Sequence, residues 1–158
     1  MRVLVTGSSG LIGSALVPRL ESEGHQVTRL ARGAQWDPEG GRIDPGALAG
    51  HDAIVHMAGA GIGDHRWTAA HKRRVLDSRV NGTAALAHAI AGLDVKPRVL
   101  VSSSAVGYYG NRGNEVLTEE SAPGDDFLAQ LCVKWEAAAQ PAADAGVRLV
   151  LLRTGIVL

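Results

Sequence analysis

The sequence predicts an α/β fold, a doubly wound parallel sheet within one domain. Short apolar runs rich in β-branched residues alternate along the 158 residues with longer segments rich in alanine and leucine. This alternation is typical of right-handed βαβ crossovers. The short runs are almost continuously apolar, as expected for strands whose two faces are both covered by helices.

The expected elements of the first third follow from local pattern. The apolar run 2–6 is the first expected strand, and leucines and alanines at helical spacing predict a helix over 11–23. The run 26–30 is the second expected strand. The segment 33–50 is rich in glycine, proline and aspartate, so we expect mostly loop there, with a short helix at 45–49.

The middle of the chain repeats the alternation. A third strand is expected over 53–57, followed by a glycine-rich loop over 59–64 and a long helix over about 67–91. The apolar run 98–103 is the fourth expected strand. A loop is expected over roughly 105–126, where apolar periodicity is lost.

The last third ends soon after a strand. A helix is expected over about 127–145 and a fifth strand over 147–152, after which Arg153-Thr-Gly155 resembles a loop that leaves the strand. A doubly wound sheet can continue beyond such a point. The end therefore looks abrupt, as in a fragment of a longer protein or a truncated gene product.

Composition argues against several classes of function. The 16 basic and 16 acidic residues balance, which gives no basic excess for nucleic acid or for an anionic membrane surface. The single Cys132 and the scattered histidines predict neither a disulfide framework nor a metal site. The first strand starts at the N-terminus without a signal peptide, and no apolar run approaches membrane-spanning length, so we expect a cytoplasmic protein.

Three glycines spaced three apart, Gly7, Gly10 and Gly13, follow the first strand and open the first helix. In this context Gly7 would serve the turn, Gly10 the approach of a phosphate, and Gly13 the close packing of helix on strand. A pyrophosphate would lie at the positive end of the helix dipole. The alternative is a glycine-rich turn without a ligand. The remaining cofactor candidates in this segment are Ser9, Leu11 and Ile12.

Arg32 follows the second strand, where NAD-selective sites carry an acidic residue that binds the ribose hydroxyls. No Asp or Glu lies between Glu23 and Asp37. Arg32 therefore favours NADP over NAD, and the alternative is an ordinary surface arginine. After the third strand come Met57 and the small residues Ala58 and Gly59, where the backbone can approach the cofactor. His56 is expected to be a hydrogen-bonded core residue.

The fourth strand ends in hydroxyl-bearing residues. Ser104 lies at the carboxyl end of a parallel strand, the edge at which ligands bind in such sheets. Its hydroxyl can hydrogen-bond a substrate alcohol or carbonyl. Tyr108 and Tyr109 follow as candidate substrate contacts or proton donors, with packing as the alternative.

These motifs together resemble those of the extended short-chain dehydrogenase/reductase superfamily, the NAD-dependent epimerase/dehydratase group. The matching segments are Thr6-Gly-Ser-Ser-Gly-Leu-Ile-Gly13, Asp52-x-x-x-His56-x-Ala58, Asn81-Gly-Thr83 and Ser102-Ser-Ser-Ala-Val-Gly-Tyr-Tyr-Gly110. An atypical epimerase-family branch is suggested by Arg66-Trp-Thr68, Ser78-Arg79, Gly107-Tyr-Tyr-Gly110 and Leu131-Cys132-x-x-Trp135-Glu136. The resemblance covers the chain. It implies a Rossmann-like NAD(P)-binding domain over 1–158, with the family's C-terminal substrate domain absent.

The chain departs from the superfamily at its usual catalytic pair, Tyr-x-x-x-Lys. Ser104 matches the family's serine, but Leu128 stands at the tyrosine position and Cys132 at the lysine position. A leucine has no proton to give, and a neutral thiol carries no fixed charge. Arg79 replaces a common asparagine and is a candidate cofactor contact. Tyr108 or Tyr109 would then be the proton donor, with Arg79 or Lys134 supplying positive charge.

Two functions stay open at this point. The first is an NAD(P)-dependent oxidoreductase or epimerase that acts on a small alcohol, a carbonyl compound or a nucleotide sugar, with NADP as the expected cofactor and NAD as the alternative. The second is a non-catalytic NAD(P)-binding sensor or scaffold. The alanine-rich segment 84–91 is either a homo-oligomer interface or a core contact.

Overall fold

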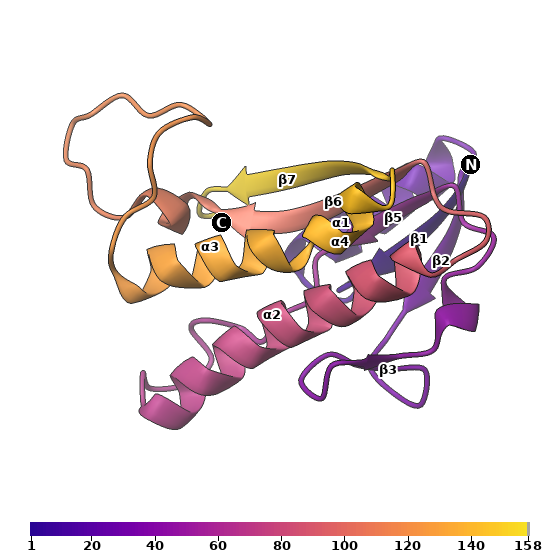
Figure 1. The fold of residues 1–158 in the computed structure, drawn as a ribbon, viewed down its shortest axis with the longest axis horizontal. Helices are drawn as coiled ribbons and strands as arrows, with labels where there is room; N and C mark the ends of the chain where they lie inside the picture. Colours follow the sequence, from indigo (N-terminus) through magenta and orange to yellow (C-terminus); the bar gives the residue numbers. More distant parts are fainter. Residues whose placement is uncertain (158) are drawn as a thin grey trace.

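The computed structural model describes residues 1–157 and contains a five-stranded parallel sheet in the order β2-β1-β5-β6-β7 (Figure 1). Its strands are β1 (Arg2–Thr6), β2 (Gln26–Leu30), β5 (Ala53–His56), β6 (Val99–Ala105) and β7 (Arg148–Thr154). Every strand of this sheet coincides with an expected one to within about two residues at each end. The prediction of a parallel α/β sheet is confirmed.

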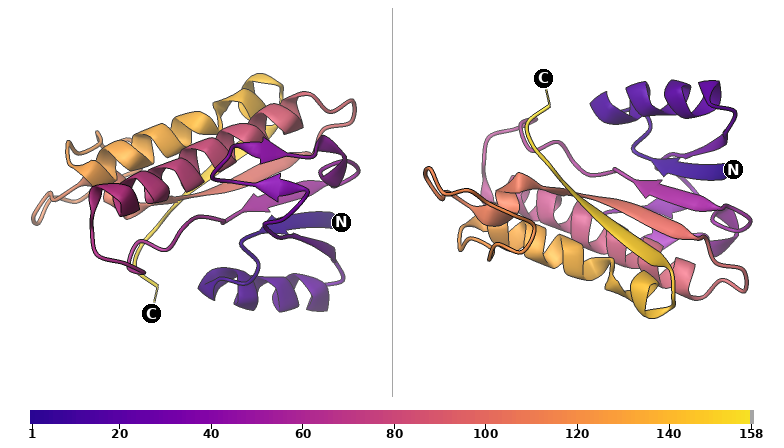
Figure 2. Two further views of the ribbon diagram at one scale, coloured as in Figure 1. Left: turned by 90° about the horizontal axis from the view of Figure 1, so that it is seen from below. Right: turned by 90° about the horizontal axis from the view of Figure 1, so that it is seen from above.

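The helices lie on both faces of the sheet. Helix α1 (Leu11–Ser22) covers one face, and α2 (Ala69–Ala91), α3 (Phe127–Ala138) and α4 (Gln140–Asp144) cover the other (Figure 2). The chain therefore changes face between the β1–α1–β2 crossover and the later ones. Because β1 pairs with β2 on one side and β5 on the other, the connections after β1 and β5 leave in opposite directions, and a crevice opens between them.

Strand alternation divides the core into two layers. Leu4, Ile54 and Leu100 are fully buried in adjacent strands and pack with Leu86 and Ile90 of α2. The neighbouring positions of β1 point to the opposite face, toward α1: Val3 and Val5 pack with Val17. The α1 stripe therefore centres on Gly13 and Val17, while Leu11 and Ile12 are exposed at the helix start.

Side-chain caps set the starts of the longer helices. The Thr68 hydroxyl accepts a hydrogen bond from the His71 N–H at 3.2 Å, and α2 begins at the next residue. Asp126 caps α3 in the same way, accepting from the Ala129 N–H at 2.8 Å. The single helix expected over 127–145 is wrong: the chain breaks at Ala139 and restarts as α4 with Pro141 in its first turn, where a missing N–H costs nothing.

Three further details differ from expectation. The segment expected to be mostly loop contains a small antiparallel hairpin, β3 (Trp36–Asp37) with β4 (Arg42–Ile43). The expected short helix is a 3₁₀ turn, η1 (Pro45–Ala47), and a second one, η2 (Val106–Tyr109), follows β6. Arg153 and Thr154 belong to β7, where they pair with Ser104 and Ala105, so the loop expected there begins later.

No helix among residues 1–157 combines the length and the apolar character that crossing a bilayer requires.

Candidate nucleotide site

The loops that follow β1 and β5 meet at the point where the connections of the sheet leave toward opposite faces. Gly7 follows β1 with φ +70°, a conformation that side chains disfavour, and an added Cβ there would lie 2.7 Å from the Met57 carbonyl carbon after β5. A Cβ on Gly13 would lie 2.2 Å from the Gly7 carbonyl oxygen. A Cβ on Gly10 would meet nothing closer than 3.4 Å. Gly7 and Gly13 are thus required by packing, and Gly10 leaves space above the turn.

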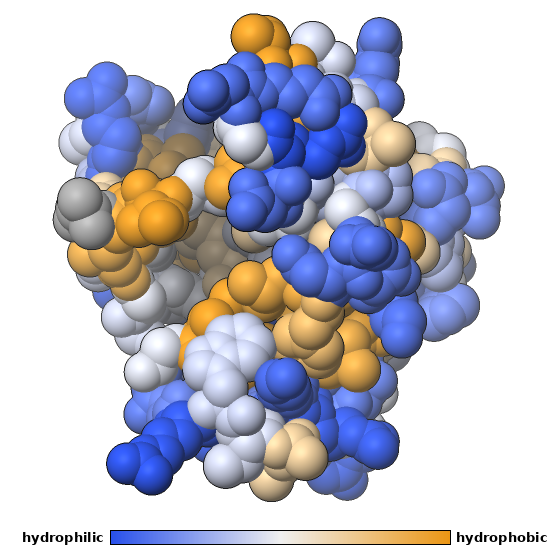
Figure 3. Space-filling model, turned by 90° about the vertical axis from the view of Figure 1, so that its left-hand side faces the viewer, coloured by the Kyte–Doolittle hydropathy of each residue, from blue (hydrophilic) through white to orange (hydrophobic). Residues whose placement is uncertain are grey.

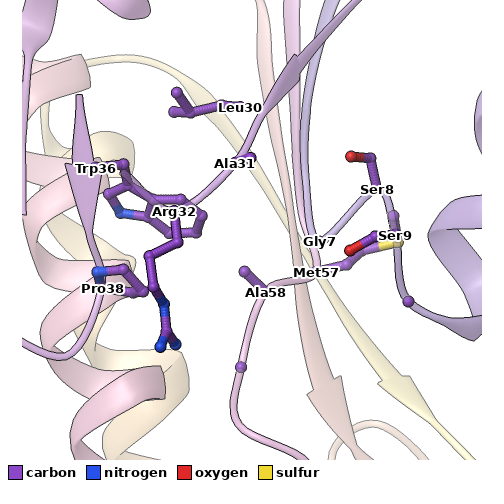
Figure 4. Close-up of a pocket in the computed structure, with 12 residues that line it drawn as sticks. Gly7, Ser8, Ser9, Leu30, Ala31, Arg32, Trp36, Pro38, Met57 and Ala58 are labelled. Carbon is purple, nitrogen blue, oxygen red and sulfur yellow. The ribbon is translucent and has the colours of Figure 1, made fainter. Parts of the chain in front are cut away.

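One end of the crevice is a cavity of about 260 Å³ between the glycine turn and the end of β2. Figure 4 shows Ser8 and Ser9 on one side of it, Arg32 and Trp36 on the other, and Ala58 between them. The full lining is Gly7, Ser8, Ser9, Gly10, Leu30, Ala31, Arg32, Trp36, Pro38, Met57, Ala58 and Gly59. Its dimensions and its cation suit a nucleoside with an anionic substituent.

Arg32 is held by a carboxylate that pattern analysis missed. Its Nη2 donates to Glu39 Oε1 at 3.0 Å, and the same oxygen accepts from Arg74 Nε at 3.1 Å. The side chain of Arg32 is 55% exposed, that of Glu39 35% and that of Arg74 46%. Glu39 lies in the turn of the β3–β4 hairpin, which the sequence did not predict. An acidic group therefore stands beside Arg32 after all.

The other end of the crevice is a cavity of about 470 Å³ over the ends of β6 and β7. It shares Gly7, Gly10 and Met57 with the first cavity. Its remaining lining is Leu11, Ile12, Gly13, Ile62, Arg79, Ser103, Ser104, Ala105, Trp135, Thr154, Gly155 and Val157. Figure 3 shows this face hollowed, with apolar residues beside the hollow.

The expected cofactor residues are brought together by the fold. Each of them lines one of the two cavities, and Ser104 lines the second. The cofactor residues are Gly7, Ser9, Gly10, Leu11, Ile12, Gly13, Arg32, Met57, Ala58, Gly59 and Arg79. They come from four separate segments of the chain. Their role in binding stays a prediction, but their common location is a property of the structure.

Arg79 supplies a buried cation at this second end. Its Nη1 donates to the Ala60 carbonyl at 2.8 Å and to the Val75 carbonyl at 3.3 Å, and its guanidinium lies 5.1 Å from the centre of the Trp135 ring. Burial lowers the pKa of Arg79. Nε is buried without a hydrogen-bond partner among the described residues. A buried guanidinium at the cavity wall favours an anionic or strongly dipolar ligand.

Ser104 belongs to a polar cluster behind the cavity. Its hydroxyl donates to Glu136 Oε1 at 2.5 Å. Arg153 binds both oxygens of the same carboxylate, Nε to Oε1 at 2.8 Å and Nη2 to Oε2 at 2.9 Å. The Glu136 and Arg153 side chains are only 10% and 18% exposed, and Glu136 raises the pKa of Arg153 further. Glu136 thus accepts hydrogen bonds from Ser104 and from Arg153 at the same time.

The two tyrosines contact Arg153, the arginine that binds the carboxylate partner of Ser104. The Tyr109 hydroxyl accepts from Arg153 Nη1 at 3.0 Å, and Tyr109 lines a separate cavity of about 460 Å³ beside β7. The Tyr108 ring stacks under the Arg153 guanidinium at 3.5 Å and packs against the buried cluster of α2 and α3. Neither side chain is among the residues that line the cavity containing Ser104, and their role as substrate contacts or proton donors stays a prediction.

Helix α3 carries the positions of the absent pair on one face. Leu128 and Cys132 both lie against Gly107, at 3.6 Å and 4.0 Å from a Cβ built there. Cys132 is buried, and burial raises the pKa of its thiol, with the Glu136 carboxylate adding to the effect. Glu136 lies one turn beyond Cys132 on the same face. Cys132 is thus a buried helix cysteine whose thiol is held neutral.

His56 is the core residue that the sequence predicted. It is fully buried between two hydroxyls, with Nδ1 2.8 Å from Thr6 Oγ1 and Nε2 2.9 Å from Thr83 Oγ1. Thr83 Oγ1 also accepts a hydrogen bond from Trp135 Nε1 at 3.0 Å. Burial lowers the pKa of His56 to about 4. The imidazole is neutral and joins β1, β5, α2 and α3.

Comparison with known proteins agrees with this geometry. The sequence model of the NAD dependent epimerase/dehydratase family matches residues 3–157. The epimerase family protein Mb2239 of Mycobacterium bovis is 46% identical over 163 residues, which cover 99% of this chain and 54% of that protein. The chain spans about half the length of the curated relatives it matches.

Two solved structures are similar throughout the chain. The nucleoside-diphosphate sugar epimerase from Corynebacterium glutamicum is 42% identical with a TM-score of 0.87, over 100% of this chain and 34% of that one. The human epimerase family protein SDR39U1 (isoform 2), solved with NADPH, is 38% identical with a TM-score of 0.85, over 100% of this chain and 55% of that one.

Proposed function

Because the chain belongs to the NAD dependent epimerase/dehydratase family, we propose that residues 1–158 are the NADP-binding unit of an oxidoreductase or epimerase. The observation that carries the proposal is the pair of cavities that meet at Gly7, Gly10 and Met57. One end offers Arg32 and the other Ser104. A dinucleotide has this form, with a phosphorylated nucleoside at one end and a reactive ring at the other.

The residues present fit such a cofactor. Gly10, the N-cap of α1, carries no side chain to bond the first-turn N–H groups, and no acidic residue lies in that turn. The helix terminus is therefore suited to an anion, as in other pyrophosphate sites. Arg32 would hold the 2′-phosphate that distinguishes NADP from NAD. When bound, NADP supplies a nicotinamide ring that accepts or releases a hydride.

Ser104 and Glu136 provide a route for the proton that accompanies hydride transfer. Ser104 donates its only proton to Glu136, so its oxygen is left as an acceptor toward the cavity. A substrate hydroxyl would give its proton to Ser104 Oγ while the Ser104 proton passes to Glu136 Oε1. Arg153 keeps the carboxylate in place. This route needs neither Tyr108 nor Tyr109.

The substrate proposed is a small molecule with a hydroxyl or carbonyl group. A nucleotide sugar comes first among these, because the Corynebacterium glutamicum relative is described as a nucleoside-diphosphate sugar epimerase. The second function, a non-catalytic NAD(P) sensor, is favoured by Leu128 and Cys132 at the positions of the absent catalytic pair. Both functions require the cofactor, and only the first requires the proton route.

The cofactor proposal is tested by titrating the folded chain with NADPH and NADH and following nicotinamide fluorescence. NADPH should bind more tightly, and Arg32→Asp should weaken NADPH and shift the preference toward NADH. Unchanged NADPH affinity in that variant would refute the role of Arg32. Absence of binding by either cofactor would refute the proposed function.

Catalysis is tested by following NADPH consumption with a panel of aldehydes, ketones and 4-keto nucleotide sugars. Turnover that Ser104→Ala abolishes, at unchanged NADPH affinity, would support the enzyme. Because an epimerase returns its cofactor unchanged, epimer formation from nucleotide sugars is measured as well. Tight NADPH binding with neither NADPH consumption nor epimer formation would favour the sensor.

A further inference from the structure

Glu39 lies beside Arg32, and the proposed function leaves this carboxylate unexplained. It carries negative charge at the place where a negatively charged 2′-phosphate is proposed to bind. Its oxygen Oε1 is shared by two guanidinium groups, one from the end of β2 and one from α2. We propose that Glu39 competes with the 2′-phosphate for Arg32, and that Arg74 weakens this competition by binding Glu39. This inference rests on the proposed NADP site.

The local backbone fixes where Glu39 can act. The Glu39 carbonyl accepts from Asn81 Nδ2 at 3.1 Å, which ties the hairpin turn to α2. Pro38 packs beside Gly82, where an added Cβ would come within 2.9 Å of the proline ring. The turn is therefore anchored to α2. The Glu39 side chain, about one third exposed, lies between Arg32 and Arg74 and can pair with either.

The charges give the direction of each effect. A phosphate monoester carries about −1.5 to −2 at neutral pH, so it and Glu39 compete for Arg32 and repel each other. At a separation of roughly 6 Å in a solvated, screened site, this repulsion corresponds to about a threefold to tenfold loss of affinity. When the phosphate takes Arg32, Glu39 still has Arg74 as a partner. Arg74 is thus a positioning residue that needs no contact with the cofactor.

A double-mutant cycle separates this relay from a direct contact. Affinities of NADPH, NADH and 2′,5′-ADP are measured at low salt for the unchanged chain, Glu39→Gln, Arg74→Met and the double variant. We expect Glu39→Gln to raise the affinity for NADPH and for 2′,5′-ADP about threefold to tenfold and to leave the affinity for NADH unchanged. Arg74→Met should weaken both 2′-phosphate ligands when Glu39 is present and have little effect in the Glu39→Gln background.

The adjacent Arg73→Met is the matched control, since it removes the same charge from an exposed position on the same helix. Its effect measures the long-range loss of one positive charge and should be smaller than that of Arg74→Met. Thermal unfolding of each variant reports any change of fold. The comparison of NADPH with NADH isolates the 2′-phosphate, because a merely structural role would alter both.

Three results would overturn the inference while leaving the proposed function intact. Equal losses from Arg74→Met in both backgrounds would mean that Arg74 contacts the phosphate. Weaker NADH binding in Glu39→Gln would make Glu39 a ribose ligand. Unchanged NADPH affinity in Glu39→Gln would mean that the carboxylate does not compete. Failure of the unchanged chain to bind any of the three ligands would instead refute the proposed function, and the relay with it.

Discussion

His56 should make the stability of this protein fall as the pH is lowered below the ordinary pKa of histidine. The perturbation is protonation of an imidazole that the fold holds neutral between Thr6 and Thr83. Its pKa is lowered from 6.5 to about 4 by burial. Above about pH 6.5 the imidazole is neutral in the folded and the unfolded chain, and the full stability is present.

The magnitude follows from the size of this pKa difference. Between about pH 6.5 and pH 4 the unfolded chain binds a proton that the folded chain does not. The free energy of unfolding then falls by about 1.4 kcal/mol per pH unit, and by about 3 kcal/mol in all. Between about pH 7 and pH 5 the loss is about 2 kcal/mol. It levels off below about pH 4, where His56 is protonated in both states.

The assay is urea unfolding at several pH values, for the unchanged chain and for His56→Asn. The range from pH 5 to pH 7 avoids the carboxylates of Asp37 and Asp52, whose pKa values are lowered below 3.8 chiefly by hydrogen bonds from the N–H groups of Gly40 and Arg2. His56→Asn lowers stability at every pH, but its curve should lack the loss of about 2 kcal/mol. His65→Asn controls for removal of an exposed imidazole. Parallel curves for the unchanged chain and His56→Asn would refute the assignment of His56 as a buried neutral residue.

Two further predictions concern the turn and the polar cluster. Gly13→Ala should lower the free energy of unfolding by about 1–3 kcal/mol and weaken NADPH binding, because its Cβ would lie 2.2 Å from the Gly7 carbonyl oxygen. A Cβ on Gly33 would meet nothing within 4 Å, so the control Gly33→Ala should change the free energy of unfolding by no more than about 0.5 kcal/mol. Equal effects of the two variants in urea unfolding would contradict the proposed packing role of Gly13. Glu136→Gln should lower the free energy of unfolding by about 3 kcal/mol, because it leaves the largely buried Arg153 without its carboxylate. The control Glu115→Gln, in the more exposed pair with Arg112, should lower it by less than about 1 kcal/mol. A Glu136 variant as stable as the Glu115 variant would show that Glu136 does not hold Arg153.

Much of the fold was predictable because most of the major strands contain a short apolar run that gives a local signal. The glycine turn was predictable for the same reason, since strand, glycines and helix follow one another within thirteen residues. The β3–β4 hairpin was not, because its two-residue strands are too short to show a period. The break at Ala139 was overlooked although Pro141 marks it, because the apolar pattern continues across it.

The site was predictable where its residues follow strand ends, and not where side chains from distant elements meet. Arg32 and Ser104 each end a strand, so their place at the crevice follows from the topology. Glu39 meets Arg32 through a hairpin without a sequence signal. Glu136 meets Ser104 through the rotation of α3 about its axis, which packing decides. The contacts of Tyr108 and Tyr109 with Arg153 were not predictable either, because they depend on how the short turn η2 meets the end of β7.

The most direct test of the central claim is the structure of this chain crystallised with NADPH. The pyrophosphate should lie at the start of α1, the 2′-phosphate should contact Arg32, and the nicotinamide should lie in the cavity beside Ser104. A nucleotide bound elsewhere, or one in the crevice with its 2′-phosphate away from Arg32, would contradict it.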